Sequence, residues 1–192
     1  MQHRDVLLAH ADRLARPRPA ISGPGEVVET FGDVAQRGAE VIVNAWNRNI
    51  IPAWMLLPQG VSRAIRKAGG KSAIRAIAAR GPLPLGAAWE TGAGDLPARW
   101  VVHVAGINLA WRGSERSVRW STRNALLLAR CLGARTVAMP LIGSGSGGFS
   151  EERAVELMRA EIDRQATHFE RVELVRYGEQ SADKPPCQQS AD

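Results

Sequence analysis

Short apolar runs alternate along the chain with longer segments in which apolar residues recur every three or four positions. The runs predict strands at 27–31, 40–43, 87–91, 100–105, 137–142 and 171–177, with 87–91 as an edge strand. The longer segments predict helices at 6–14, 61–68, 72–79 and 117–132, with a further helix after Ser150. Strands that alternate with helices in this way indicate an α/β layered fold around one core.

The most informative stretch runs from residue 137 to 158 and is typical of a strand, a glycine loop and a helix. Glycine occupies four of the six positions 143–148, and Ser150 with the two glutamates after it fits a helix N-terminus. Glycines let a backbone approach a ligand closely, and successive amide N–H groups before a helix bind anions. The stretch therefore predicts a phosphate cradle, with an ordinary tight turn as the alternative.

Gly143, Gly145 and Gly148 also fit the spacing of a dinucleotide-binding fingerprint. That fingerprint belongs to the first βαβ unit of its fold and needs an acidic residue at the end of the next strand. Here the glycines lie late in the chain, and the next apolar run ends in Arg176 and Tyr177. A dinucleotide site is therefore the weaker interpretation.

Composition narrows the compartment and the partners. The chain has 192 residues, a formal charge of +6 and two cysteines, Cys131 and Cys187, which we expect to be free thiols in a reducing compartment. No apolar run reaches the ~18 residues of a membrane helix, and the N-terminus lacks the apolar segment of a signal peptide. We therefore expect a cytoplasmic protein without membrane contact.

The basic charge suits polyanions, but the cations are scattered without a recognition motif, which favours a solvated basic surface over a nucleic-acid groove.

The four histidines lie apart from the cysteines and from each other in the sequence, so no metal site is predicted. His103 falls inside an apolar strand. A hydrogen-bonded core histidine is therefore favoured over a catalytic one.

Four segments together resemble the macrodomain family, in the family's order and spacing. Residues 32–34 (GDV) resemble its G-D-I, and residues 41–47 (VIVNAWN) resemble its I-V-N-A-A-N. Residues 84–103 match its P-x-G through L-P-A-K-Y-V-I-H without a gap, and residues 123–126 and 139–145 resemble its Y-R-N-A-L and F-P-A-I-S-T-G. The resemblance covers about 26–178, leaving an N-terminal extension at 1–25 and a polar tail at 179–192, which we expect to be disordered.

The resemblance implies a three-layer α/β/α sandwich around a central mixed sheet, with ADP-ribose in a cleft above the strand ends. Asp33 would accept the adenine amino group, the Val34 amide would contact the ring, and Tyr177 would flank it. Asn44 would brace the loop, and Asn47 would hydrogen-bond the distal ribose. The diphosphate would be held by Gly60 and Val61 on one side and by Gly143, Ser144, Gly145, Ser146, Gly147, Gly148 and Phe149 on the other.

The departures from the family concern catalysis. Hydrolytic members run N-x-x-L-x-G-G-G-G-V-D-G, whereas thirteen residues separate Asn47 from Val61 here and the aspartate position is Ser62. The second-loop aromatic near the distal ribose becomes Gly147, although Phe149 keeps the following aromatic position. The apolar loop 48–60 is expected to pack as a lid or at an interface, and Trp54 in it is a candidate for the missing wall.

Two hypotheses follow. The first is a hydrolase that releases ADP-ribose from a mono-ADP-ribosylated substrate or deacetylates O-acetyl-ADP-ribose, with Asn47 and Ser62 as catalytic candidates. Serine is no general base at neutral pH unless another group activates it, and Glu90 and Asp95 are weak candidates for that base. The second is a non-catalytic reader of ADP-ribose or a related nucleotide. Neither requires a cofactor, and a monomer is expected, with nucleic acid left open as a partner.

Overall fold

The computed structural model describes residues 21, 23, 25–48 and 60–178. Within them, six strands form one sheet in the order β1-β6-β5-β2-β4-β3. The strands are β1 (Glu26–Phe31), β2 (Val41–Trp46), β3 (Ala88–Gly92), β4 (Trp100–Ala105), β5 (Thr136–Pro140) and β6 (Arg171–Arg176). All neighbouring pairs are parallel except β3 and β4, so the sheet is mixed.

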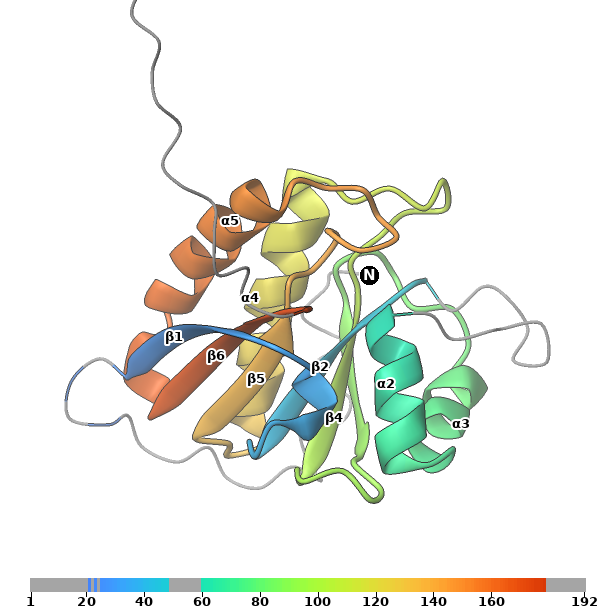
Figure 1. The fold of residues 1–192 in the computed structure, drawn as a ribbon, viewed down its shortest axis with the longest axis horizontal. Coiled ribbons are helices and arrows are strands. Elements are labelled where there is room, and N and C mark those ends of the chain that lie inside the picture. Colours follow the sequence, from blue (N-terminus) through green and yellow to red (C-terminus); the bar gives the residue numbers. More distant parts are fainter. Residues whose placement is uncertain (1–20, 22, 24, 49–59, 179–192) are drawn as a thin grey trace, which may run out of the picture.

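Helices cover both faces of this sheet (Figure 1). On one face lie α4 (Glu115–Cys131) and α5 (Glu151–Asp163). On the other face lie η2 (Val34–Gln36), α2 (Gly60–Gly69) and α3 (Ser72–Ala79), and η3 (Ala166–His168) precedes β6. The expected three-layer α/β/α sandwich is confirmed.

Alternation along the central strands supplies an apolar cluster to each helical layer. Val41 and Val43 of β2 pack with residues of α4 and α5, whereas Ile42 packs with residues of η2 and α2. All three side chains are fully buried. Strands buried on both faces are nearly continuous apolar runs in the sequence, and this made them predictable.

The boundaries of several elements differ from the sequence predictions. Both α3 and β4 have the predicted bounds, while β2 continues through the polar Asn44 to Trp46. The helix α4 begins before the predicted Ser117 because Ser114 caps it. The Ser114 hydroxyl accepts a hydrogen bond from the Ser117 amide (3.2 Å), and the Ser117 hydroxyl accepts one from the Ser114 amide (3.0 Å).

Several predictions for the chain ends and for the lid fall outside the described residues. They concern the helix at 6–14, most of the extension 1–25, residues 49–59 of the apolar loop with Trp54, the tail 179–192 and Cys187. In the part of the chain that the structure describes, no helix is long and apolar enough to cross a bilayer.

Candidate functional site

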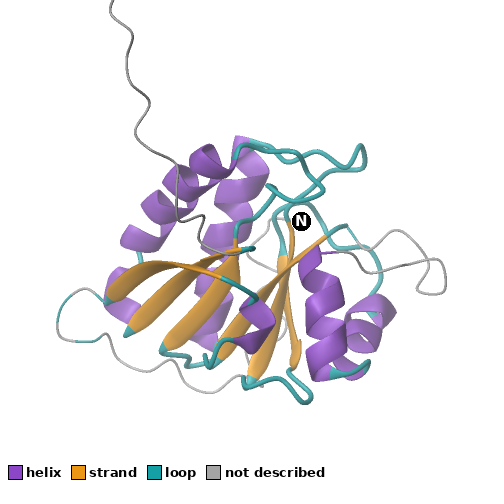
Figure 2. Cartoon of the chain, in the orientation of Figure 1, coloured by secondary structure: helices purple, strands orange, loops and turns teal. Residues whose placement is uncertain are grey.

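A cleft of about 400 Å³ opens at the carboxyl ends of the parallel strands. Open α/β sheets bind their ligands at this edge. The ends of β2, β5 and β6 form its floor with residues 106–107 after β4. The first turn of α2 and residues 143–147 of the glycine loop (143–149) form its walls. The glycine loop and the loop 106–113 lie side by side above the sheet (Figure 2). A hydrogen bond from the Gly113 amide to the Gly147 carbonyl (2.9 Å) joins the two loops.

The glycine loop presents a row of free donors. The amide N–H groups of five consecutive residues, 143–147, donate no hydrogen bond to another described residue. Two carbonyl groups of the loop accept hydrogen bonds from within it, because Gly143 accepts from the Phe149 amide (3.1 Å) and Gly145 from the Gly148 amide (3.1 Å). Successive free N–H groups of this kind form an anion-binding concavity.

The loop needs glycine for two different reasons. Gly143 and Gly148 have φ values of +85° and +60°, in the left-handed region where other residues are strained. Gly147 instead lacks space, because an added Cβ would overlap the Gly143 carbonyl and lie 2.6 Å from Cγ2 of Ile107. This crowding explains why no aromatic side chain stands at position 147.

The first turn of α2 forms the opposite wall of the cleft with Gly60 and Val61. Amides in the first turn of a helix have no intrahelical partner, and the helix dipole adds positive potential there. Among the described lining residues none is a lysine or arginine, and the charged one is Glu151, whose carboxylate lies 3.7 Å from the Arg176 guanidinium. The described lining thus offers an anion backbone dipoles and no cationic side chain.

Asp33 and Val34 follow β1, next to the end of β6. The Gly32 amide donates to the Arg176 carbonyl (2.8 Å), which holds this segment beside Tyr177. Asp33 Oδ1 accepts a hydrogen bond from the backbone of η2 (2.9 Å), and Val34 is buried. Tyr177 lines the cleft and is 84% exposed. The structure thus brings Asp33 and Val34 to the corner of the cleft that Tyr177 occupies, adjacent to the lining rather than within it.

A chain of buried polar side chains lies beneath the cleft. The Ser62 hydroxyl donates to Asn44 Oδ1 (2.9 Å), and Asn44 Nδ2 lies 3.0 Å from His103 Nδ1. His103 Nε2 lies 2.8 Å from the Thr91 hydroxyl. Because the Asn44 amide donates to Nδ1, the histidine proton is on Nε2 and points to Thr91. The prediction that His103 is a hydrogen-bonded core residue is confirmed.

Burial lowers the pKa of His103 from 6.5 to about 3, with a smaller contribution from the Arg80 charge. The imidazole is therefore neutral at physiological pH. It acts as a link between strands β2, β4 and β3, not as a proton carrier.

The catalytic candidates are placed as follows. Ser62 is 6% exposed, and its hydroxyl donates a hydrogen bond to the side-chain amide oxygen of Asn44. Both residues lie outside the lining of the cleft. Asn47 is half-buried, one residue beyond the cleft residue Trp46. Glu90 is paired with an arginine of the α3–β3 connection (2.9 Å), and Asp95 is exposed, and neither carboxylate lines the cleft.

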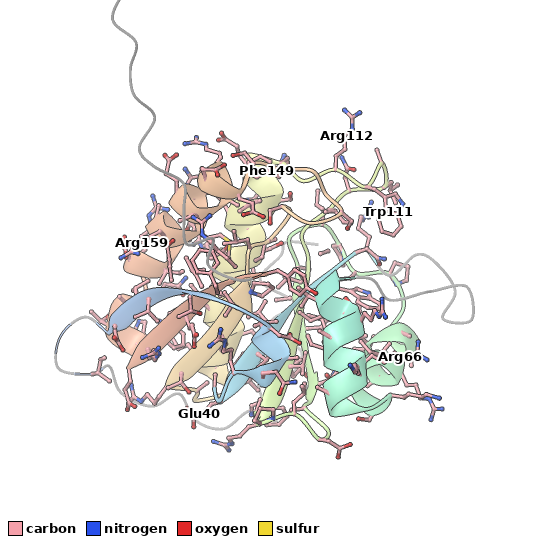
Figure 3. The ribbon with its side chains drawn as sticks, viewed as in Figure 1. Glu40, Arg66, Trp111, Arg112, Phe149 and Arg159 are labelled. Atoms are coloured by element: carbon pink, nitrogen blue, oxygen red, sulfur yellow. The ribbon has the colours of Figure 1, made fainter. Side chains whose placement is uncertain are left out.

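Two members of the glycine loop are outside the lining. Gly148 turns the chain toward α5, and Phe149 packs against the apolar cluster under α4 and α5 (Figure 3). Sequence reasoning missed eight residues that do line the cleft, namely Ala45, Trp46, Gly106, Ile107, Pro140, Leu141, Glu151 and Val175. Glu151 was interpreted only as a helix-dipole partner, although its position directly after the loop and the cap was a usable signal.

Comparison with known proteins decides the family. The model of the Macro domain family matches residues 43–158. The chain belongs to the macrodomain family. The order of motifs described above therefore reflects membership of that family.

Relatives differ in how much of their length the macrodomain fills. An uncharacterized protein of Mycobacterium tuberculosis is 34% identical over 162 residues, which are 81% of this chain and 44% of that protein. The chain thus spans less than half the length of the mycobacterial relatives it matches. The O-acetyl-ADP-ribose deacetylase of Klebsiella pneumoniae is 32% identical over 163 residues, which are 79% of this chain and 89% of the deacetylase.

Solved macrodomains share the fold. A variant of the Oceanobacillus iheyensis macrodomain with ADPR has a TM-score of 0.70 at 24% identity, covering 82% of this chain and 88% of that one. The Trypanosoma brucei macrodomain in complex with ADP-ribose has a TM-score of 0.69 at 21% identity, covering 92% and 81%. At these identities the likeness establishes the architecture alone.

Proposed function

We propose that the cleft binds ADP-ribose. The observation that carries this proposal is the row of five amides, 143–147, without a described hydrogen-bond acceptor, opposite the first turn of α2 in a cleft whose described lining residues include no lysine or arginine. A diphosphate is an anion of the size and charge that converging backbone N–H groups accommodate. Family membership and the ligand named for the Trypanosoma brucei structure support the same ligand.

The two ends of the ligand fit the two ends of the cleft. Adenine would lie at the Tyr177 corner, with its amino group donating to Asp33 and the Val34 amide at the ring. The distal ribose would lie toward the end of β2, where Asn47 would hydrogen-bond it. Asn44 would act indirectly, by holding Ser62 and hence the first turn of α2 in place.

We further propose hydrolysis of a bond at the distal ribose as the reaction. A water held by a ligand phosphate would attack the ribose C1″ and break its bond to the substrate group, or attack the carbonyl carbon of an ester on that ribose and break the acyl C–O bond. The water would supply a hydroxyl to the attacked carbon and a proton to the leaving atom, with Asn47 orienting the sugar. The named activity of the Klebsiella pneumoniae relative supports this class. A catalytic role for Ser62 stays a prediction, and its bond to Asn44 favours a positioning role.

A non-catalytic reader is the alternative. Glu151 is the one carboxylate among the described lining residues, and Arg176 partly neutralises it. A cleft with so few proton acceptors is suited to binding without turnover. The predicted monomeric state and cytoplasmic location remain predictions under either function.

Calorimetric titration with ADP-ribose, and with AMP as the comparator, tests the binding proposal. We expect ADP-ribose to bind more tightly than AMP, and Asp33→Ala to weaken ADP-ribose binding by roughly tenfold or more, the scale for loss of a charged hydrogen-bond partner. Unchanged affinity in Asp33→Ala would refute the adenine assignment. No binding of ADP-ribose to the wild type would refute the site.

Turnover separates the two functions. The protein is incubated with mono-ADP-ribosylated protein and with O-acetyl-ADP-ribose, and the released products are measured against a buffer control. Release that is lost in Asn47→Ala but retained in Ser62→Ala would support the hydrolase with Ser62 as a positioning residue. Tight binding with no release from either substrate would establish the reader.

A further inference from the structure

One long continuous segment of this chain carries cations and no carboxylate. Between Glu40 and Glu90 the sequence contains no carboxylate and seven cations, Arg48, Arg63, Arg66, Lys67, Lys71, Arg75 and Arg80. A segment of charge +7 in a chain of net charge +6 leaves −1 for all remaining residues. The cations of this segment therefore have no carboxylate near them in the sequence.

Folding gathers five of these cations on the outer side of α2 and α3. The basic face consists of Arg63, Arg66, Lys67, Lys71 and Arg75, all of them exposed. The first three recur at helical spacing on the side of α2 opposite its buried residues. Arg66 projects from the middle of this helix (Figure 3).

The basic face has no internal counter-charge. None of its five cations forms an ion pair within the described part of the chain. Several arginines elsewhere do, because Arg153 pairs with Glu115 (2.8 Å), Arg159 with Glu29 (3.3 Å) and Arg171 with Glu26 (2.9 Å). Arg123 and Arg130 of α4, like the basic face, form no ion pair with a described residue. An uncompensated set of neighbouring cations creates a local positive potential that attracts polyanions.

The basic face is continuous with the cleft, because α2 begins at the cleft with Gly60. Across the cleft, the loop 106–113 contributes Ile107 to the lining and exposes Leu109 (64%) and Trp111 (48%) beyond it. Figure 3 shows Trp111 and Arg112 projecting outward from this loop. The mouth of the cleft is thus flanked by cations on one side and by an aromatic side chain on the other.

The backbone of Trp111 is held in an unusual conformation. Its φ is +57°, the one positive value among the described non-glycine residues. The Asn108 side chain maintains this turn by accepting hydrogen bonds from the amides of Ala110 (2.9 Å) and Arg112 (3.0 Å), and the Trp111 amide donates to the Asn108 carbonyl (3.1 Å). Strain of this kind persists where the surroundings impose it, and it clusters at functional sites.

We propose that this face binds a single strand of nucleic acid, with phosphates on the basic face and a base stacked on Trp111. Cationic surfaces with exposed aromatic side chains are the general means of holding single strands. A membrane surface fits less well, because no large apolar side chain is exposed on the described α2 and α3 beside the cations. Resting on the proposed function, the substrate class would be ADP-ribose attached to nucleic acid, with the strand leading the modified group into the cleft.

Fluorescence anisotropy of a labelled oligothymidylate tests the proposal on the full chain. The probe has about 20 nucleotides, longer than one such site, and salt is varied between about 50 and 200 mM. The test variant is Arg66→Gln/Lys67→Gln. The control is Arg123→Gln/Arg130→Gln, which removes the same charge from exposed positions of α4 on the opposite face of the sheet.

We expect the test pair to weaken binding roughly tenfold or more near 0.1 M salt and to lower the slope of log K against log salt by about 1.4, since each phosphate contact contributes about 0.7. The control pair should retain wild-type affinity. Trp111→Ala should weaken binding roughly fivefold or more, and Trp111→Tyr, which keeps a ring, should retain most of it. Free ADP-ribose affinity should not change in the test pair.

The outcomes separate this proposal from the binding of ADP-ribose. Absence of oligonucleotide binding, or an equal loss in the control pair, would overturn it whether or not ADP-ribose binds. Preferential binding to phosphatidylserine vesicles or to polyglutamate would assign the basic face to a membrane or an acidic protein and would also overturn it. Unchanged binding in Trp111→Ala would overturn the stacking contact.

Discussion

Asn44 joins three structural elements through one amide group. Its oxygen accepts a hydrogen bond from the Ser62 hydroxyl of α2, and its nitrogen donates one to His103 of β4. These two bonds tie the central strand β2 to α2 and to β4. Such a buried polar residue is stable only because both ends of the amide are satisfied. This series of hydrogen bonds ends at Thr91 of the edge strand β3, and none of its side chains is charged.

The depressed pKa of His103 makes folding depend on pH. Between pH 3 and 6.5 the unfolded chain binds one more proton than the native protein, so stability is complete above pH 6.5 and is lost as the pH falls. Lowering the pH to 5 should cost about 2 kcal/mol from this group, at about 1.4 kcal/mol per pH unit. His103→Gln keeps an acceptor and a donor but cannot titrate. In urea unfolding at pH 7 and pH 5, the free energy of unfolding of His103→Gln should fall less between the two pH values than that of the wild type, by about that amount.

Glu151 places a negative charge at a site proposed to bind a diphosphate. Replacing it by glutamine should strengthen ADP-ribose binding by roughly two- to fivefold at low salt, the size of a partly screened charge interaction. Glu170→Gln is the matched control, because Glu170 is exposed and precedes β6 at the end away from the cleft. Weaker binding in Glu151→Gln would instead give Glu151 a direct role in holding the ligand.

At the scale of elements, the glycine loop is fixed by contacts with the loop 106–113 as much as by its own sequence. The Gly113 amide bonds the Gly147 carbonyl, and Ile107 lies against Gly147. These two loops follow β4 and β5, which lie on either side of β2 in the sheet. The cleft wall is therefore a property of the pair of loops.

Alanine substitutions in the loop should differ in their effect on stability. Gly147→Ala forces a methyl group against Ile107 and should destabilise the fold by ~1–3 kcal/mol, the usual cost of overpacking. Gly145→Ala has no atom within 4 Å of the added Cβ and no positive φ, so it should leave stability unchanged or slightly raised. Thermal unfolding of the two variants measures the difference. Equal melting temperatures would contradict the crowding at position 147.

Local sequence patterns located these strands well. They failed where a contact with a residue far away in the sequence determines the end of a strand or the residue type. The strands β4 and β5 were found because both of their faces are buried. The second strand, β2, was cut short at Asn44 because a polar residue ends an apolar run in the sequence, and only its bonds to Ser62 and His103 allow the strand to continue. The reason for glycine at 147 lies in Ile107, which is far away in sequence.

At the scale of the whole molecule, the layers separate two kinds of surface. The side with α4 and α5 combines arginines paired with carboxylates and unpaired ones such as Arg123, whereas the five cations of the basic face on α2 and α3 have no ion pair with a described residue. Net charge alone did not distinguish these cases, since +6 fits a solvated surface as well as a patch. The cleft lies where the two sides meet, so any ligand in it is exposed to both.

The free amides of the glycine loop have a consequence for how this family changes over time. Main-chain donors are common to all twenty amino acids except proline, so truncating a side chain cannot remove them. An alanine scan of the loop would therefore report crowding and would miss the donors themselves. Homologous loops can drift in sequence while they keep the same ligand, as long as the backbone path survives. The informative changes are those that add atoms or delete an N–H group, and proline at Ser144 or Ser146 is the most direct of them.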